Sequence, residues 1–135
     1  MKIFVLLLLC CVGVAAEETP LLRALIAVES RGNDSAIGDI GLRHKAYGCL
    51  QIRQPCVDDV NTFCGTSYRA EDTLGNRALS IWIFKKYTER YTTSARLEHG
   101  PTAEDIARIW NGGPNGWKKA STLPYWAKVQ KALKK

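Results

Sequence analysis

The chain is 135 residues long, about the length of one domain, and its formal net charge at pH 7 is +6. Its five cysteines are too few for a protein held together mainly by disulfides, and the sequence shows no repeat, linker or low-complexity segment. The basic charge favours polyanions such as bacterial walls, anionic membranes, glycosaminoglycans or nucleic acids. Charge alone does not choose among them, and a surface that only keeps the protein soluble fits equally well.

The first sixteen residues have the pattern of a secretory signal peptide. Lys2 precedes an apolar run, 3–12, that is too short to span a bilayer, and small residues at 14–16 suit a cleavage site. We therefore predict that residues 1–16 are removed and that residues 17–135 form a single domain. We expect a secreted protein, either extracellular or delivered to a digestive compartment.

The stretch from Thr19 to Ser30 predicts a short amphipathic helix. Thr19 and Pro20 suit its first positions, and apolar residues recur at helical spacing on one face, which also carries Glu29. Gly32 predicts that the helix stops near Ser30, so Glu29 lies in its last turn. Partial burial and the negative end of the helix dipole should both raise the pKa of Glu29 toward that of a general acid. A structural glutamate at a helix boundary is nevertheless the commoner case.

A turn-rich region follows the first helix. Residues 31–46 are rich in glycine and aspartate, which predicts a loop or a small hairpin. The mostly apolar run 47–52 suits either a strand or the entry to a helix. Pro55 fits the first turn of the next helix, and Gly65 should end it.

The longest periodic segment, 74–91, is apolar almost all round its middle and predicts a buried central helix. Thr102 and Asp105 resemble a capping box that opens a further helix. The glycine-rich stretch 111–116 predicts a tight loop, and a last helix should start near residue 122.

Three cysteines, Cys49, Cys56 and Cys64, remain once the signal peptide is removed, which allows at most one intramolecular disulfide. Cys56 and Cys64 flank a predicted helix and would be about 12 Å apart, too far for a bond, so the pairing stays open. The two histidines, His44 and His99, have no cysteine or acid partners at ligand spacing, so we predict no metal site and no cofactor.

Carboxylates are the remaining candidates for chemistry. Asp34 and Asp39 lie in the loop that must fold back over the end of the first helix, which can bring a second carboxylate near Glu29. Two carboxylates in unequal environments, one apolar and one polar, are the apparatus for cleaving a glycosidic bond. Aspartates in glycine-rich loops more often cap turns, so the pattern alone leaves both interpretations open.

Four motifs occur in order and span nearly the whole mature chain. They are Glu29-Ser30, Tyr47-Gly48-Cys49-Leu50-Gln51-Ile52, Ala107-Arg108-Ile109-Trp110-Asn111-Gly112-Gly113-Pro114 and Tyr125-Trp126-Ala127-Lys128-Val129. In this order they resemble the motifs of the lytic-transglycosylase-like lysozymes, and the later two resemble those of the invertebrate-type lysozymes still more closely. This resemblance implies an α+β, predominantly helical, lysozyme-like fold with at most a small β element after the first helix.

The resemblance also implies roles for single residues. Glu29 would be the general acid, and Asp39 the second carboxylate that stabilises or attacks the anomeric carbon. Gln51, Asn111 and Tyr125 match motif positions near the cleft and should bind sugar or hold Glu29 in place. Trp110 suits a platform under a sugar ring and a place in the core equally well. The predicted substrate-binding residues are Ser30, Tyr47, Gln51, Trp110, Asn111 and Tyr125.

The chain departs from these families at several points. Invertebrate-type lysozymes are rich in disulfides, so this chain must rely more on packing. The segment 42–46 makes the link from Asp39 to the next motif longer than in the family. Trp110 stands where a histidine is common, and Arg53 follows Gln51 where goose-type lysozymes carry an acid.

The resemblance implies a glycoside hydrolase that cleaves the β-1,4 bond after N-acetylmuramic acid in bacterial peptidoglycan. A lytic transglycosylase, which makes the same cut without water, is one alternative. A non-catalytic glycan-binding or membrane-active defence protein is another. We expect a monomer that binds peptidoglycan strands, is drawn to bacterial surfaces by charge and does not bind nucleic acid.

Overall fold

The computed structural model describes residues 18–135, and the predicted signal peptide lies outside them. Short helices dominate, with one small hairpin after the first helix, so the expected predominantly helical α+β class is confirmed. Within residues 18–135 no helix is long and apolar enough to cross a bilayer. The elements are α1 (Pro20–Ser30), β1 (Ile37–Gly38), β2 (Ala46–Tyr47), α2 (Gln54–Cys64), η1 (Ala70–Thr73), α3 (Arg77–Tyr91), α4 (Ser94–Leu97), α5 (Ala103–Gly112), η2 (Gly116–Lys118), η3 (Ala120–Thr122) and α6 (Leu123–Leu133).

Side-chain caps fix the helix ends that the sequence predicts. The Thr19 hydroxyl accepts a hydrogen bond from the Leu22 amide at the start of α1, and the helix stops at Arg31, whose backbone is left-handed with φ 55°. Thr102 and Asp105 form the predicted capping box of α5. These caps place Glu29 in the last turn of α1, as expected.

Helix α3 is the longest helix in the described chain, but it starts later than the periodicity suggests. Residue 74 follows the separate turn η1, and α3 begins at Arg77 because the Asn76 side chain accepts a hydrogen bond from the Leu79 amide. The run 47–52 is also neither a full strand nor a helix. Its first residue, Tyr47, ends β2, and the chain then turns back so that Ile52 forms an isolated antiparallel bridge with Tyr47.

The prediction that 111–116 is entirely loop is wrong at its start, because α5 continues through Gly112. Gly112 is needed for close packing, since a Cβ there would lie 2.4 Å from the Thr122 Cγ2 atom. The turn itself falls one residue later, at Gly113, which has φ 84°. Gly116 is similarly confined, because its Cβ would lie 2.0 Å from the Arg108 carbonyl oxygen.

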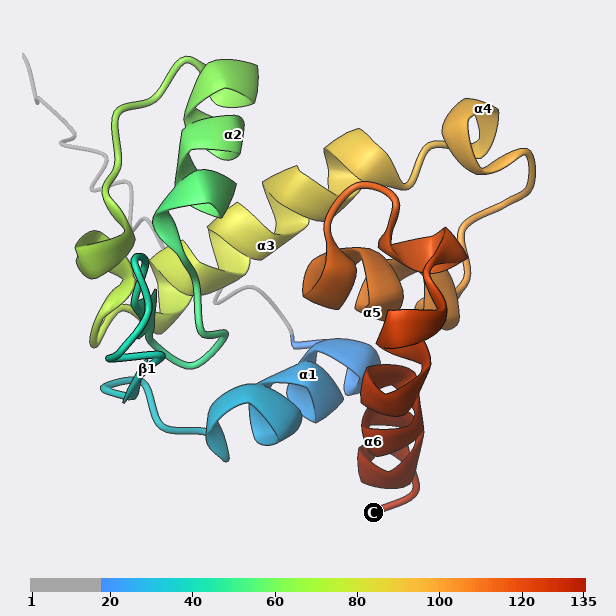
Figure 1. Cartoon of the computed structure of the whole chain (residues 1–135), viewed down its shortest axis with the longest axis horizontal. Helices are drawn as coiled ribbons and strands as arrows, with labels where there is room; N and C mark the ends of the chain where they lie inside the picture. Colours follow the sequence, from blue (N-terminus) through green and yellow to red (C-terminus); the bar gives the residue numbers. More distant parts are fainter. Residues whose placement is uncertain (1–17) are drawn as a thin grey trace, which may run out of the picture.

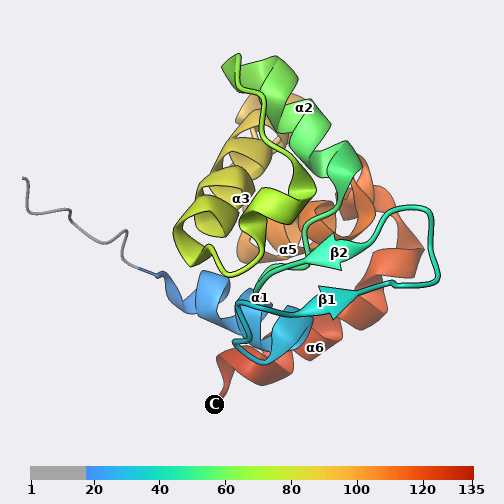
Figure 2. The ribbon, with the colours of Figure 1, turned by 90° about the vertical axis from the view of Figure 1, so that its left-hand side faces the viewer.

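The helices surround a single core in which α3 is central. Ile83 of α3 is fully buried and belongs to the same apolar cluster as Leu25 of α1, Val57 of α2 and Ile109 of α5. Figure 1 shows α1 and α6 side by side, although they lie at opposite ends of the described chain. Figure 2 shows the β1–β2 hairpin beside the end of α1, with Ile37 paired to Tyr47 in the ladder.

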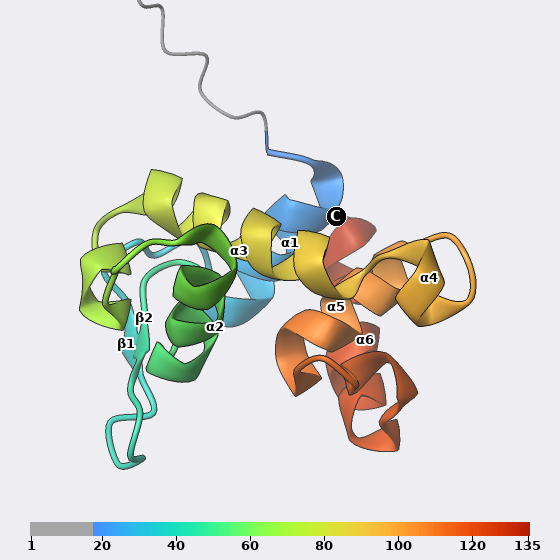
Figure 3. The ribbon, with the colours of Figure 1, turned by 90° about the horizontal axis from the view of Figure 1, so that it is seen from above.

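Seen from above, the molecule has two sides that α3 connects. One side holds α2 and the hairpin, and the other holds α5 and α6 (Figure 3). Helix α3 packs against both α2 and α5. This arrangement lets the turn after α1, the hairpin loop and the end of α5 approach one another.

The three cysteines in the described chain are free thiols, so none of the open disulfide pairings is formed among them. Cys49 is fully buried in the core, and Cys56 and Cys64 pack against it. Burial raises the pKa of Cys49 to about 11 and that of Cys56 to about 12. These cysteines therefore act as small apolar side chains that stabilise the fold by packing.

Candidate active site

The predicted catalytic pair meets in one cavity of about 350 Å³. Its walls come from the end of α1, the hairpin loop, the start of α2, the middle of α3 and the end of α5. Its polar side chains include carboxyl, amide and guanidinium groups, which form hydrogen bonds with ligands rich in hydroxyl groups. The lining residues are Glu29, Asp39, Gln51, Ile52, Arg53, Cys56, Tyr87, Trp110 and Asn111.

Glu29 lies in an environment that raises the pKa of its carboxyl. Burial is the main influence and raises the pKa of its carboxyl, and the nearby Asp39 charge raises it further. The hydrogen bond from Tyr125 and the positive charges of Arg53 and Lys128 act in the opposite direction. Burial prevails, so the pKa of Glu29 lies above its ordinary value, as the sequence predicts.

Tyr125 fixes the position of Glu29. Its hydroxyl donates to Oε1 of Glu29 over 2.7 Å, and it does so from the first turn of α6. Tyr125 does not line the cavity itself. The predicted alternative that it holds Glu29 in place is therefore the one that the geometry supports.

Asp39 reaches the cavity despite the long segment 42–46. It follows β1 directly, with a left-handed backbone at φ 54°, and its carboxylate forms an ion pair with Arg53, the residue before α2. This ion pair ties the hairpin loop to α2 beside Glu29. Arg53 is a site residue that the sequence revealed only as a departure from a related family.

Gln51 is held rigidly where the cavity wall turns. It has φ 52°, and its Nε2 atom donates to the carbonyl oxygens of Gly48, over 3.1 Å, and Ala36, over 3.4 Å. Its Oε1 atom lies where a side chain on Gly38 would have to be, since a Cβ there would come within 2.1 Å. Gln51 therefore links β1 to the cavity floor while it lines the cavity.

Trp110 combines the two roles between which the sequence left a choice. Its ring packs edge-on against Phe84 and Tyr87, with centroid separations of 5.1 Å and 5.8 Å, and it still lines the cavity. Asn111, one residue on, is exposed at the cavity wall. Tyr87 and Cys56 also line the cavity, but their apolar helix positions gave only a core signal in the sequence.

Ser30 and Tyr47 do not line this cavity. The Ser30 hydroxyl donates to the carbonyl oxygens of Cys49, over 2.7 Å, and Ile26, over 3.2 Å, so it joins α1 to the turn after β2. Tyr47 pairs with Ile52 through its backbone and lines a separate hollow of about 280 Å³. Contact of either residue with substrate stays a prediction.

The site offers acid catalysis by two unequal carboxylates. Glu29 is partly buried and its pKa is raised, whereas Asp39 is one-third exposed and paired with a cation. Within residues 18–135 no cluster of histidine, cysteine and acid side chains is placed to hold a metal ion. The arrangement can therefore donate a proton from one side of a bound molecule and present a negative charge to it from another.

Known proteins were compared with the chain. No family model matches it. A lysozyme of Magallana gigas is 31% identical over 119 residues, which cover 85% of this chain and 80% of that protein. The chain belongs to the lysozyme family. An invertebrate-type lysozyme of Ruditapes philippinarum is 35% identical over 85 residues, covering 62% of this chain and 58% of that protein.

Solved lysozyme structures share the fold. The lysozyme of Tapes japonica superposes with a TM-score of 0.70 at 26% identity, and an inhibitor-bound lysozyme of Meretrix lusoria with a TM-score of 0.64 at 27% identity. Each comparison covers 84% of this chain and 88% of the other. The lysozyme-like fold and the resemblance to invertebrate-type lysozymes are thus confirmed, and with them the assignment to the glycoside hydrolases.

Proposed function

We propose that this lysozyme is a secreted muramidase that hydrolyses the β-1,4 bond between N-acetylmuramic acid and N-acetylglucosamine in peptidoglycan. One observation carries the proposal: the partly buried Glu29 carboxyl, held by Tyr125, shares a cavity with the Asp39 carboxylate. The family relationship supports glycosidic cleavage, and the motif resemblance supports the bacterial wall as its target.

In this mechanism Glu29 protonates the glycosidic oxygen as the bond from that oxygen to the anomeric carbon breaks. Asp39 then stabilises or attacks the positive anomeric carbon. Glu29 next accepts a proton from the water that completes hydrolysis, so the configuration is retained. Because donation needs the neutral acid, the rate should fall as the pH rises through the raised pKa of Glu29.

The remaining cavity residues suit a sugar chain. Gln51 and Asn111 present amide groups toward sugar hydroxyls, and Trp110 presents an aromatic ring. The net charge of +6 favours approach to anionic walls. We further propose that the protein acts as a monomer.

Digestion of purified peptidoglycan followed by mass spectrometry tests the proposal. Hydrolysis should release muropeptides with ordinary reducing ends, and Asp39→Asn should lose nearly as much activity as Glu29→Gln. Anhydro products, lighter by one water, together with an active Asp39→Asn variant would instead establish a lytic transglycosylase. An absence of cleavage by the wild-type protein would contradict both and favour a binding or membrane-active protein.

A further inference from the structure

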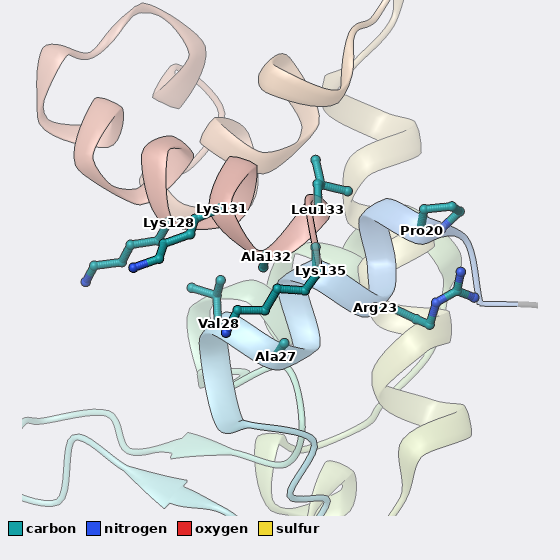
Figure 4. A pocket seen from close by; sticks show the side chains of 10 residues that line it. Pro20, Arg23, Ala27, Val28, Lys128, Lys131, Ala132, Leu133 and Lys135 are labelled. Atoms are coloured by element: carbon teal, nitrogen blue, oxygen red, sulfur yellow. The ribbon is translucent and has the colours of Figure 1, made fainter.

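A second, larger hollow lies away from the catalytic cavity, in the groove between α1 and α6. Its volume is about 550 Å³, and none of its lining residues lines the catalytic cavity (Figure 4). Its floor is made of small apolar side chains, Ala24, Ala27 and Val28 from α1 and Ala132 from α6. Because these side chains are short, the two packed helices leave a trough between them.

Basic side chains border this apolar floor. Arg23 comes from α1, Lys128 and Lys131 come from α6, and Lys135 follows α6. No acidic side chain lines the groove, and none of these four cations forms an ion pair with an acidic side chain of the described chain. The groove therefore combines an apolar surface with basic side chains that have no acidic side-chain partner among the described residues.

The charges and the apolar surface have a definite arrangement along the groove. Figure 4 shows Lys128 and Lys131 extending at the end where Val28 lies, whereas Pro20 and Leu133 lie toward the other end. Leu133 is 39% exposed and so is open to an apolar ligand at that end. The groove also adjoins a hollow of about 600 Å³, with which it shares Arg23, Ala27 and Lys135, so the available space is elongated.

We propose that this groove binds a single-chain anionic amphiphile, with its apolar chain on the alanine floor and its phosphate or carboxylate group at Lys128 and Lys131. An elongated trough matches a chain better than a compact anion, and the apolar floor gives a free phosphate nothing to contact. The paired lysines give an acidic head group charge-assisted hydrogen bonds.

The position of the groove gives such binding a link to the enzyme. The groove lies between the two helices that supply Glu29 and Tyr125, and Lys128 also acts electrostatically on Glu29. A bound amphiphile would therefore bridge α1 and α6 behind the catalytic hydrogen bond. The binding proposal itself does not depend on the reaction that the cavity performs.

Titration calorimetry with monomeric dodecyl phosphate tests the proposal on the full mature chain. Inorganic phosphate supplies the head group without the chain, and dodecyltrimethylammonium supplies the chain with the opposite charge. Dodecyl phosphate should bind at least about tenfold more tightly than either, because both parts of the groove contribute. A control probe that binds as tightly as dodecyl phosphate would overturn the proposal.

Two kinds of variant locate the site. Ala27→Trp fills the exposed floor without changing charge, and Lys128→Gln with Lys131→Gln removes the two cations assigned to the head group. Each should weaken dodecyl phosphate binding at least about tenfold. The matched controls are Ala78→Trp and the pair Lys45→Gln with Lys85→Gln, at exposed positions outside the groove. These should leave binding within about twofold.

Because the two variants act independently, a folding defect in one leaves the other decisive. Retained binding in Lys128→Gln with Lys131→Gln would contradict the assignment of the head group. Vesicles of phosphatidylglycerol provide the remaining comparison. If the wild-type protein binds them but not monomeric dodecyl phosphate, and Ala27→Trp binds them equally well, then general surface charge is responsible and the groove proposal fails.

Discussion

Replacing Arg53 by glutamine tests how the hairpin loop is held at the cavity. Among the described residues, the Asp39 carboxylate has one side-chain partner, and that partner is Arg53. Without the guanidinium, the loop that carries Asp39 loses its tie to α2. We therefore expect Arg53→Gln to lower the maximal rate of wall cleavage by at least about tenfold, because a misplacement of about 1 Å can cost about a hundredfold.

The same change should hardly affect stability. The two side chains are 49% and 33% exposed, and ion pairs in such positions contribute at most about 1 kcal/mol to the free energy of unfolding. The midpoint of thermal unfolding should therefore fall by no more than about 6 °C. A large loss of rate with a small loss of stability identifies positioning as the role of Arg53.

The pH profile separates this role from an effect through Glu29. Arg53 lowers the pKa of Glu29, so its removal raises that pKa further and extends activity to higher pH. If this were its only role, the maximal rate would survive in Arg53→Gln. The control is Arg43→Gln, in the hairpin loop that carries Asp39 but without an ion pair among the described residues. In a double variant, Arg53→Gln should lower the rate little further than Asp39→Asn alone, because both changes remove the same ion pair. An Arg53→Gln enzyme that keeps its maximal rate would refute the reasoning.

Three other predictions concern acidity, charge and the thiols. Glu29→Gln should lower the lytic rate at least about a hundredfold. The raised pKa of Glu29 means that its ionised form destabilises the folded protein, so Glu29→Gln should also raise the unfolding temperature at neutral pH. This gain should disappear below the ordinary glutamate pKa, and a difference between variant and wild type that stays the same at every pH would contradict the reasoning. Lysis of whole cells should weaken with added salt, while cleavage of a short neutral chitooligosaccharide should not; equal sensitivity would exclude electrostatic steering. A thiol reductant should leave the unfolding temperature unchanged, because the three described cysteines are free, and a clear decrease would reveal a disulfide.

Local rules explain which parts of the fold the sequence predicts. Caps and breakers act within a few residues, so Thr19, Gly65 and the Thr102–Asp105 pair mark their helix ends correctly. Gly112 was misread because its lack of a side chain serves contact with Thr122, a residue of another element, and not a turn. The sequence alone does not distinguish a glycine required for close packing from a glycine required for a turn.

The two carboxylates of the cavity are predictable from the sequence, but their partners are less so. Glu29 stands on an apolar face at a helix end, which is a local pattern, and motif resemblance supplied Asp39 and Tyr125. Arg53 and Cys56 line the cavity only because the chain turns at 48–52 and presents the start of α2 to α1. Such contacts depend on tertiary geometry, for which the spacing of residues gives no direct sign.

The hydrogen bond between Glu29 and Tyr125 joins residues 96 positions apart. A ribosome produces Glu29 early and Tyr125 late, so a nascent chain carries the acid for most of its synthesis without the hydroxyl that orients it. The active arrangement can form only after α6 has emerged and docked on α1. Wall-cleaving activity should therefore arise at the last stage of folding, and its recovery after dilution from denaturant should coincide with the docking of α6.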